Sequence, residues 1–200
     1  MKLLITGGCG FLGSNLAAHA IEQGIDLVVF DNLSRFGAVA NLQWLQSKGS
    51  FKFVHGDIRN SNDVSRIVKE LKPDSVYHLA GQVAMTTSIA NTRMDFEVNA
   101  LGSFNVLEAV RDHSPNACVL YSSTNKVYGD TPNRLPLVEL EKRWEIAADH
   151  PYFIGIDEHM SIDQTKHSIF GASKVAADVL VQEYGRYFGM PTMSMRGGCL

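Results

Sequence analysis

The sequence predicts an α/β fold, a doubly wound parallel sheet with helices on both faces. Short apolar runs alternate with segments of helical periodicity from the first residues to Ser123. Repeated strand–helix–strand units of this kind form parallel sheets whose crossover helices cover both faces. The 200 residues, 45% of them hydrophobic, are enough to bury one core. We therefore expect one domain over 1–200.

The expected strands are short apolar runs that end at glycine or at a polar residue. They cover 2–6, 26–30, 51–54, 75–80, 118–123 and 192–195. The expected helices have apolar residues three or four apart, and two of them end at Gly24 and before Pro73. They cover 11–23, 60–71, 96–113 and 171–188.

The segment 129–167 differs from the rest of the chain. It is polar, contains Pro132, Pro136 and Pro151, and has weak periodicity. Loops of that length inside a domain are usually functional. We interpret it as an active-site excursion over the mouth of the sheet.

Composition argues against several other classes of protein. A net charge of −3 without a basic stripe argues against nucleic acid as a partner. No apolar run reaches about 18 residues, and the apolar start is interrupted by glycines, so neither a membrane span nor a secretory signal is expected. The predicted location is cytoplasmic. Cys9, Cys118 and Cys199 form no CxxC pair, the seven histidines are dispersed, and we expect no metal site.

A glycine-rich turn joins the first strand to the first helix, in the run Gly7-Gly8-Cys9-Gly10-Phe11-Leu12-Gly13. Gly7 permits a tight turn, Gly10 lets the backbone approach a pyrophosphate, and Gly13 lets the helix pack on the strand. The free N–H groups of the helix start then attract the anion. This pattern is typical of a Rossmann domain that binds a dinucleotide.

Further residues follow the next three strands and complete the expected NAD site. Asp31 would bond the adenosine ribose and repel a 2′-phosphate, which favours NAD over NADP. Arg35 leaves the opposite preference open, because arginine can accept that phosphate. Asp57 and Ile58 are expected beside the adenine, although an Asp after a strand is commonly a helix cap. The remaining expected contacts are Asn32, Ser34, Leu79, Ala80, Gly81 and Gln82.

Several motifs together resemble one family, the extended short-chain dehydrogenase/reductases that act on nucleotide sugars. The resemblance covers the whole chain. Two runs, 82–88 and 123–128, most resemble the 2-epimerase branch of this family. The matching segments are 6–14, 31–34, 56–59, 78–81, Asn99 with Gly102, 121–124 and 127–129.

The resemblance implies a nucleotide-sugar epimerase that keeps NAD bound and inverts a carbon such as C2 by transient oxidation and re-reduction. It implies that Thr124 bonds the reacting oxygen and that Lys174 holds the nicotinamide ribose. Asn99 joins the expected cofactor contacts. The implied substrate contacts are Val83, Ala84, Met85, Thr86, Thr124, Asn125 and Lys126.

One position departs from the family pattern. The family pairs this lysine with a tyrosine four residues earlier, where this chain has Phe170. Phenylalanine transfers no proton, so Tyr128, His167 and Lys174 are candidate substitutes. A non-catalytic NAD or nucleotide-sugar binding protein is one alternative, and a 4-epimerase is another. A 4,6-dehydratase is disfavoured, because that branch has Asp-Glu where Asn125 and Lys126 stand.

The resemblance also implies an assembly and a further region. In the family, helices equivalent to 96–113 and 172–188 pair with a second subunit, and we expect a homodimer or higher homo-oligomer. The apolar faces expected to contribute include Phe104, Val106, Leu107, Val175, Val179, Leu180 and Tyr184. A substrate-binding C-terminal region is expected beyond residue 200.

Overall fold

The computed structural model describes residues 1–198 and confirms the α/β architecture. Six parallel strands form one sheet in the order β3-β2-β1-β4-β5-β8. The chain builds outward from β1 to β3 and then returns to the other side of β1. Ligands of such sheets bind at this switch point, beyond the carboxyl ends of the strands. The strands are β1 (Lys2–Thr6), β2 (Asp26–Asp31), β3 (Lys52–His55), β4 (Ser75–His78), β5 (Cys118–Ser122) and β8 (Thr192–Met195).

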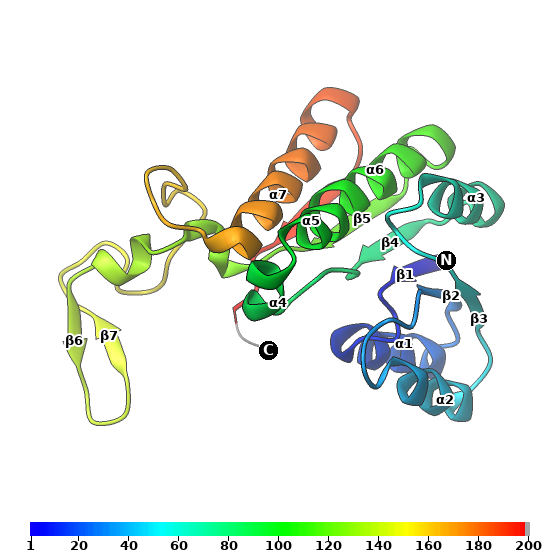
Figure 1. The fold of residues 1–200 in the computed structure, drawn as a ribbon, viewed down its shortest axis with the longest axis horizontal. Helices are drawn as coiled ribbons and strands as arrows, with labels where there is room; N and C mark the ends of the chain where they lie inside the picture. The colour runs from blue at the N-terminus through cyan, green and yellow to red at the C-terminus, as the bar shows by residue number, and fades with distance from the viewer. Residues whose placement is uncertain (199–200) are drawn as a thin grey trace.

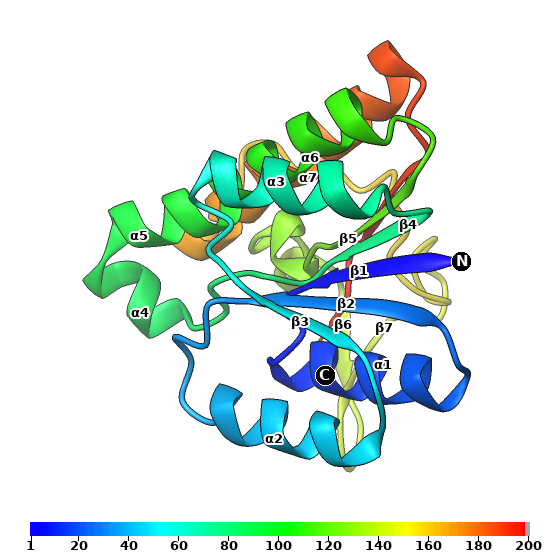
Figure 2. The same cartoon turned by 90° about the vertical axis from the view of Figure 1, so that its right-hand side faces the viewer.

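Helices cover both faces of the sheet (Figures 1 and 2). On one face lie α1 (Phe11–Glu22) and α2 (Ala38–Lys48). On the other lie α3 (Ser61–Leu71), α6 (Gly102–His113) and α7 (Ser168–Phe188). Two short helices, α4 (Met85–Ala90) and α5 (Thr92–Phe96), lead through a π-helical turn at Glu97–Leu101 into α6.

Each face of the sheet has its own core. Leu4 and Val28 pack with residues of α3, α6 and α7. Leu3, Ile5 and Val29 pack on the opposite face with residues of α1 and α2. Successive side chains of a strand point to opposite faces, and both faces of this sheet are covered. This is why the strands are continuous apolar runs in the sequence.

The structure corrects several details of the sequence interpretation. Helix α2 was not predicted, because its apolar residues do not gather on one face and only Ala38 and Leu45 are buried. In α1 the packed face consists of small residues such as Ala17 and Ala18, whereas Leu16 is only partly buried. The helix expected over 96–113 contains the π-helical turn, and the strand expected to reach residue 80 ends at His78.

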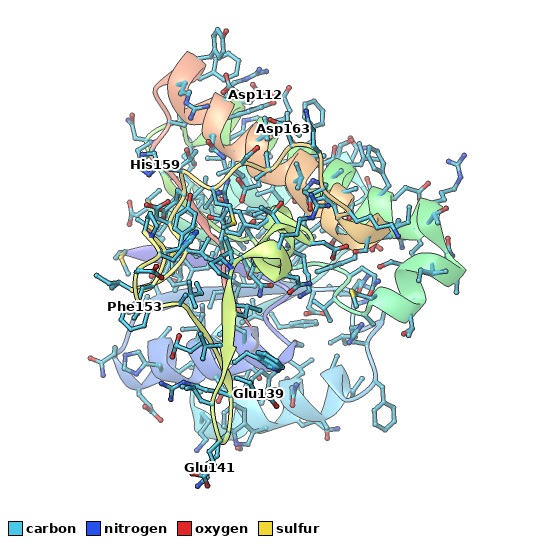
Figure 3. All side chains as sticks on the ribbon, turned by 90° about the vertical axis from the view of Figure 1, so that its left-hand side faces the viewer. Asp112, Glu139, Glu141, Phe153, His159 and Asp163 are labelled. Carbon is cyan, nitrogen blue, oxygen red and sulfur yellow. The ribbon has the colours of Figure 1, made fainter. Side chains whose placement is uncertain are left out.

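The excursion 129–167 contains a β-hairpin that the sequence did not predict. Strands β6 (Leu137–Glu139) and β7 (Trp144–Ile146) pair antiparallel and extend away from the sheet (Figure 1). Figure 3 shows Glu141 at the hairpin tip and Phe153 on the loop that follows. A small core of Val127, Tyr128 and Met160 anchors the excursion to the domain.

Candidate functional site

A cleft of about 750 Å³ lies at the carboxyl ends of the central strands. Its walls come from the glycine-rich turn, the ends of β2, β4 and β5, and the first two turns of α7. Most residues expected to contact cofactor or substrate line it. They are Gly7, Gly10, Phe11, Leu12, Gly13, Asp31, Asn32, Ser34, Arg35, Asp57, Ile58, Leu79, Ala80, Gly81, Gln82, Val83, Met85, Thr124, Asn125, Lys126, Phe170 and Lys174.

The glycine-rich turn has the shape that the sequence predicts. Gly7 has a φ of +70°, a conformation that L side chains rarely adopt. A Cβ at Gly13 would lie 2.2 Å from the carbonyl oxygen of Gly7, so only glycine fits there. Gly10 begins α1 without a side-chain cap, which leaves the first N–H groups of the helix free to bind an anion.

Asp31 is held at the end of β2 by two backbone groups. The N–H of Cys9 donates to one carboxylate oxygen at 2.9 Å, and the N–H of Leu33 donates to the other at 2.8 Å. These bonds orient the carboxylate, and each oxygen retains a lone pair for another donor. The arrangement therefore suits a ligand with vicinal hydroxyl groups.

Asp57 is fixed mainly by its neighbours. Arg59 donates to both of its oxygens, with a shortest distance of 2.6 Å, and the Asn32 amide donates at 3.0 Å. The hydrogen bond from Arg59 is the largest influence that lowers the pKa of Asp57, to about 2. Asp57 is thus a charged wall of the cleft.

The other end of the cleft contains Thr124, Phe170 and Lys174. Phe170 and Lys174 lie one turn apart on α7, on the face directed at β5. The Lys174 Nζ donates to the carbonyl oxygen of Ser122 at 2.6 Å and lies 4.4 Å from the ring centroid of Tyr121. Burial lowers the pKa of Lys174 to about 8, although Asp178 and Asp95 oppose this shift.

A buried polar network supports this end of the cleft. Ser88 and Ser173 each donate to the Asp95 carboxylate at 2.5 Å. The Asn99 amide donates to Ser173 Oγ at 3.0 Å, and its oxygen accepts from the N–H of Gln82 at 2.9 Å. Asn99 lies in the π-helical turn, a feature frequent at functional sites. The network fixes the loop after β4 against α7.

Three expected contact residues do not line the cleft. Asn99 lies behind Gln82 and Ser173, so it positions wall residues and does not form the wall. Ala84 and Thr86 are also outside the lining, and Thr87 is part of it instead. The loop after β4 turns into α4, and the helical turn directs adjacent threonines to different sides.

Two of the candidate substitutes for the missing tyrosine are directed elsewhere. The Tyr128 hydroxyl accepts from Arg196 Nη1 at 3.0 Å, and the His167 ring bonds the carbonyl oxygen of Ile162 at 2.8 Å. Neither side chain lines the cleft. Lys174 is the one of the three that does.

Other lining residues were missed by the sequence interpretation. No residue of the excursion 129–167 lines the cleft, so the excursion does not cover the mouth of the cleft as the sequence predicted. Apolar lining residues such as Phe30 and Val98 carry no signal that separates them from the core. The missed residues are Cys9, Phe30, Phe36, Ala38, Asn41, Gly56, Met94, Val98, Ser122, Ser123, Gly197 and Gly198.

Residues 1–198 contain neither a candidate metal site nor a candidate membrane span. No group of three or more His, Cys, Asp or Glu side chains in this range is arranged to hold a metal ion. None of the helices in the same range is both long and apolar enough to cross a membrane. Cys199 lies outside the described residues.

Comparison with known proteins shows the family to which the chain belongs. A family model described as GDP-mannose 4,6 dehydratase matches residues 4–197. The chain belongs to this family. It is 58% identical over 98% of its length to CDP-paratose 2-epimerase of Salmonella typhi, of which it covers 56%. It is 32% identical over 96% of its length to dTDP-glucose 4,6-dehydratase of Salmonella typhimurium, of which it covers 53%.

Solved structures show the same fold. A UDP-glucose 4-epimerase of Thermus thermophilus, in complex with NAD, matches with a TM-score of 0.74 and 28% identity, over 98% of this chain and 54% of that one. A double mutant of DesIV, a dTDP-glucose 4,6-dehydratase of Streptomyces venezuelae with NAD and DAU bound, matches with a TM-score of 0.76 and 27% identity, over 98% and 55%. The chain thus spans about half the length of these relatives.

Proposed function

We propose that the protein is an NAD-dependent nucleotide-sugar epimerase that inverts C2 of the sugar by transient oxidation and re-reduction. One observation carries the proposal. A glycine cradle, an oriented Asp31 and the Thr124–Lys174 pair lie in a single cleft of a chain that is 58% identical to a CDP-paratose 2-epimerase. When bound, NAD supplies the acceptor and donor of hydride. The substrate is a nucleotide sugar, and CDP-paratose is the one named by the relative.

The residues of the cleft fit a dinucleotide. The start of α1 would hold the pyrophosphate, since its N–H groups lack a side-chain cap and Gly13 admits no bulkier residue. Asp31 would hold the adenosine ribose, with Asn32, Ser34 and Arg35 beside it. Lys174 would hold the nicotinamide ribose next to Thr124.

The carboxylate of Asp31 is expected to make the protein bind NAD more tightly than NADP. A 2′-phosphate would place like charges side by side at the end of β2, and such contacts are unfavourable. Calorimetry with both cofactors measures this preference. Equal affinities, or tighter binding of NADP, would contradict the role of Asp31 and favour a phosphate contact from Arg35.

The loop after β4 is proposed to contact the sugar through Thr87. Replacing Thr87 with valine removes one hydroxyl and is expected to weaken sugar-nucleotide binding by about 3–10-fold, the value of one hydrogen bond. Thr86 is the matched control, because it is also exposed and does not line the cleft. Calorimetry on Thr87→Val and Thr86→Val tests the assignment. The assignment of Thr87 to the sugar site would be wrong if both variants bound the sugar nucleotide equally well, or if Thr87→Val also bound NAD more weakly.

We also propose that α6 and α7 pair with a second copy of the chain. The apolar face available for pairing is smaller than the sequence predicted, because Val106, Leu107 and Tyr184 are buried in the core. Phe104 and Val179 remain 38% and 40% exposed on the two adjacent helices. The partly buried Val175 and Leu180 of α7 complete the proposed face.

A charge on this face is expected to separate the dimer. Phe104→Glu with Val179→Glu would place two carboxylates in an apolar interface, where unpaired charge is strongly unfavourable. Val39→Glu on α2 is the control, because Val39 is also exposed and lies on the other side of the sheet. Light scattering measures the mass. A monomeric unmodified protein would rule out the dimer.

One alternative function has an observation in its favour. Phe170 stands where the family has a tyrosine, which favours a protein that binds NAD and a nucleotide sugar without turnover. Both functions share the proposed cytoplasmic location, which the free thiols of Cys9 and Cys118 support. Turnover of a nucleotide sugar separates the two functions.

A further inference from the structure

Epimerisation by oxidation needs a proton acceptor that Phe170 cannot supply. Oxidation of a carbinol removes a hydride from carbon and a proton from oxygen, and the proton needs an acceptor within hydrogen-bond reach. The inference drawn below about this acceptor rests on the proposed epimerase function. The ionisable side chains that line the described cleft are Cys9, Asp31, Arg35, Asp57, Lys126 and Lys174.

Position separates these candidates. Asp31 and Cys9 contact each other at the end of β2, and Asp57 is bonded by Arg59. Arg35 follows the same strand. These four groups belong to the end of the cleft that would hold the adenosine. The two lysines remain near Thr124, and of these Lys174 is buried whereas Lys126 is only partly so.

We propose that Lys174 itself is the catalytic acid–base and replaces the missing phenol. In the oxidation, bound NAD would accept the hydride, which is the hydrogen of the C–H bond with its electron pair. The O–H bond breaks, its proton passes to the neutral amine of Lys174, and the C=O bond forms. In the return step the ammonium gives the proton back to oxygen as the hydride returns to the other face of the carbon. Lys174 thus regains its neutral form, because the proton and the hydride are both returned to the sugar.

The packing around Lys174 suits this role. The Lys174 Nζ is anchored by one donated hydrogen bond, to the carbonyl oxygen of Ser122 at 2.6 Å. A neutral amine keeps a lone pair that can face the substrate while this bond is made. Gly81 lies beside it, since a Cβ there would be 3.7 Å from the Nζ, and so leaves space next to the amine.

Ionisable groups from four elements surround Lys174, and two of them influence its pKa. Burial lowers its pKa to about 8, and the carboxylates of Asp178 on α7 and Asp95 on α5 limit the decrease. Tyr121 on β5 lies under the Nζ, and burial raises the pKa of its phenol, so it remains neutral. His78 on β4 also remains neutral, because burial and the Lys174 charge lower its pKa to about 3.

A single substitution separates proton transfer from cofactor binding. Arginine retains a cation and donors at position 174 but does not deprotonate in proteins. Lys174→Arg is therefore expected to retain bound NAD and to lose about 10²-fold or more in the rate of NADH formation with the sugar nucleotide. Adding Phe170→Tyr to this variant is expected to restore the rate, because a phenol then lies beside a permanent cation.

A direct titration provides a readout that does not depend on turnover. NMR of the protein labelled with ¹³C-lysine, with Lys174→Arg assigning the signal, is expected to show Lys174 titrating near its pKa of about 8. The base must be neutral, so the oxidation rate should rise with pH through the same midpoint.

Two results would overturn the inference. One is a Lys174→Arg variant that retains the normal rate. The other is an oxidation rate of the unmodified protein that does not rise with pH at the midpoint of the Lys174 titration. This second result would overturn the inference even if both variants that contain Lys174→Arg were inactive. The absence of NADH formation in the unmodified protein and in Phe170→Tyr, with NAD bound, would instead refute the proposed epimerase.

Discussion

Replacing Phe170 with tyrosine is expected to raise the rate of sugar oxidation at pH 7 by about 10–10²-fold. A positioned acid/base contributes about 10²–10⁴-fold to rate. Lys174 supplies part of that contribution, but with a pKa of about 8 most of it is protonated at pH 7. A phenol at position 170 would enter the cleft that Phe170 already lines, one helical turn from the lysine cation. Stopped-flow measurement of NADH absorbance gives the rate.

The matched control for this gain is Phe153→Tyr. Phe153 lies on the outer loop of the excursion, away from the cleft (Figure 3). It receives the same hydroxyl and should leave the rate unchanged. A Phe170→Tyr variant that binds NAD normally and reacts no faster would show that the phenol is not what limits this site.

Removing the Asp178 carboxylate is expected to cost about 3–5 kcal/mol of unfolding free energy, the usual penalty for breaking a buried ion pair. Asp178 is 1% exposed and accepts from Ser123 Oγ at 2.5 Å and Arg196 Nη2 at 2.9 Å. Asp178→Ala leaves the partly buried Arg196 guanidinium, whose side chain is 15% exposed, without its counter-charge. Urea unfolding measures the loss, and it should be accompanied by weaker NAD binding because Arg196 precedes two glycines that line the cleft.

An exposed pair on α6 provides the control for this loss. Asp112 pairs with Arg111 near the surface, where ion pairs contribute about 0–1 kcal/mol. Asp112→Ala should therefore change stability little. Replacing both members of the buried pair, in Asp178→Leu with Arg196→Met, should recover much of the stability because no charge remains unpaired. Equal losses in Asp178→Ala and Asp112→Ala would contradict this account.

Acid should weaken the same ion pair. Burial alone would raise the pKa of Asp178, but hydrogen bonds from Arg196, Ser123 and Ser194 hold it below its ordinary value. A carboxyl group with a depressed folded-state pKa contributes stability above its unfolded pKa of about 3.9 and loses it as the pH falls. This contribution is therefore present at neutral pH and absent from Asp178→Ala.

The parallel sheet and the glycine-rich turn could be predicted from the sequence because local rules determine them. Strands buried on both faces must be apolar where they are buried, as in 27–30. Gly7 and Gly13 are required by a positive φ and by a close backbone contact, and both requirements appear as glycine in the sequence. The cleft residues that follow strands, such as Asp31 and Asp57, were found for the same reason.

The features that were missed depend on contacts between distant segments. Asn99 was expected at the cofactor, but it bonds Ser173, which lies on another helix 74 residues later. Hairpin β6–β7 has exposed strands, so its apolar alternation is weak. Helix α2 buries only two residues, which gives little periodicity. The orientation of His167, whose ring bonds the carbonyl oxygen of Ile162, has no local sequence signal either.

The central claim, nucleotide-sugar epimerisation through a bound NAD, is tested most directly by incubating the full-length protein with a panel of nucleotide sugars that includes CDP-paratose. NADH absorbance and the NMR spectrum of the sugar are followed together. The account predicts a transient rise in NADH and the appearance of the C2 epimer, both faster in Phe170→Tyr. Bound NAD with neither signal in either protein would contradict it and identify a binding protein instead.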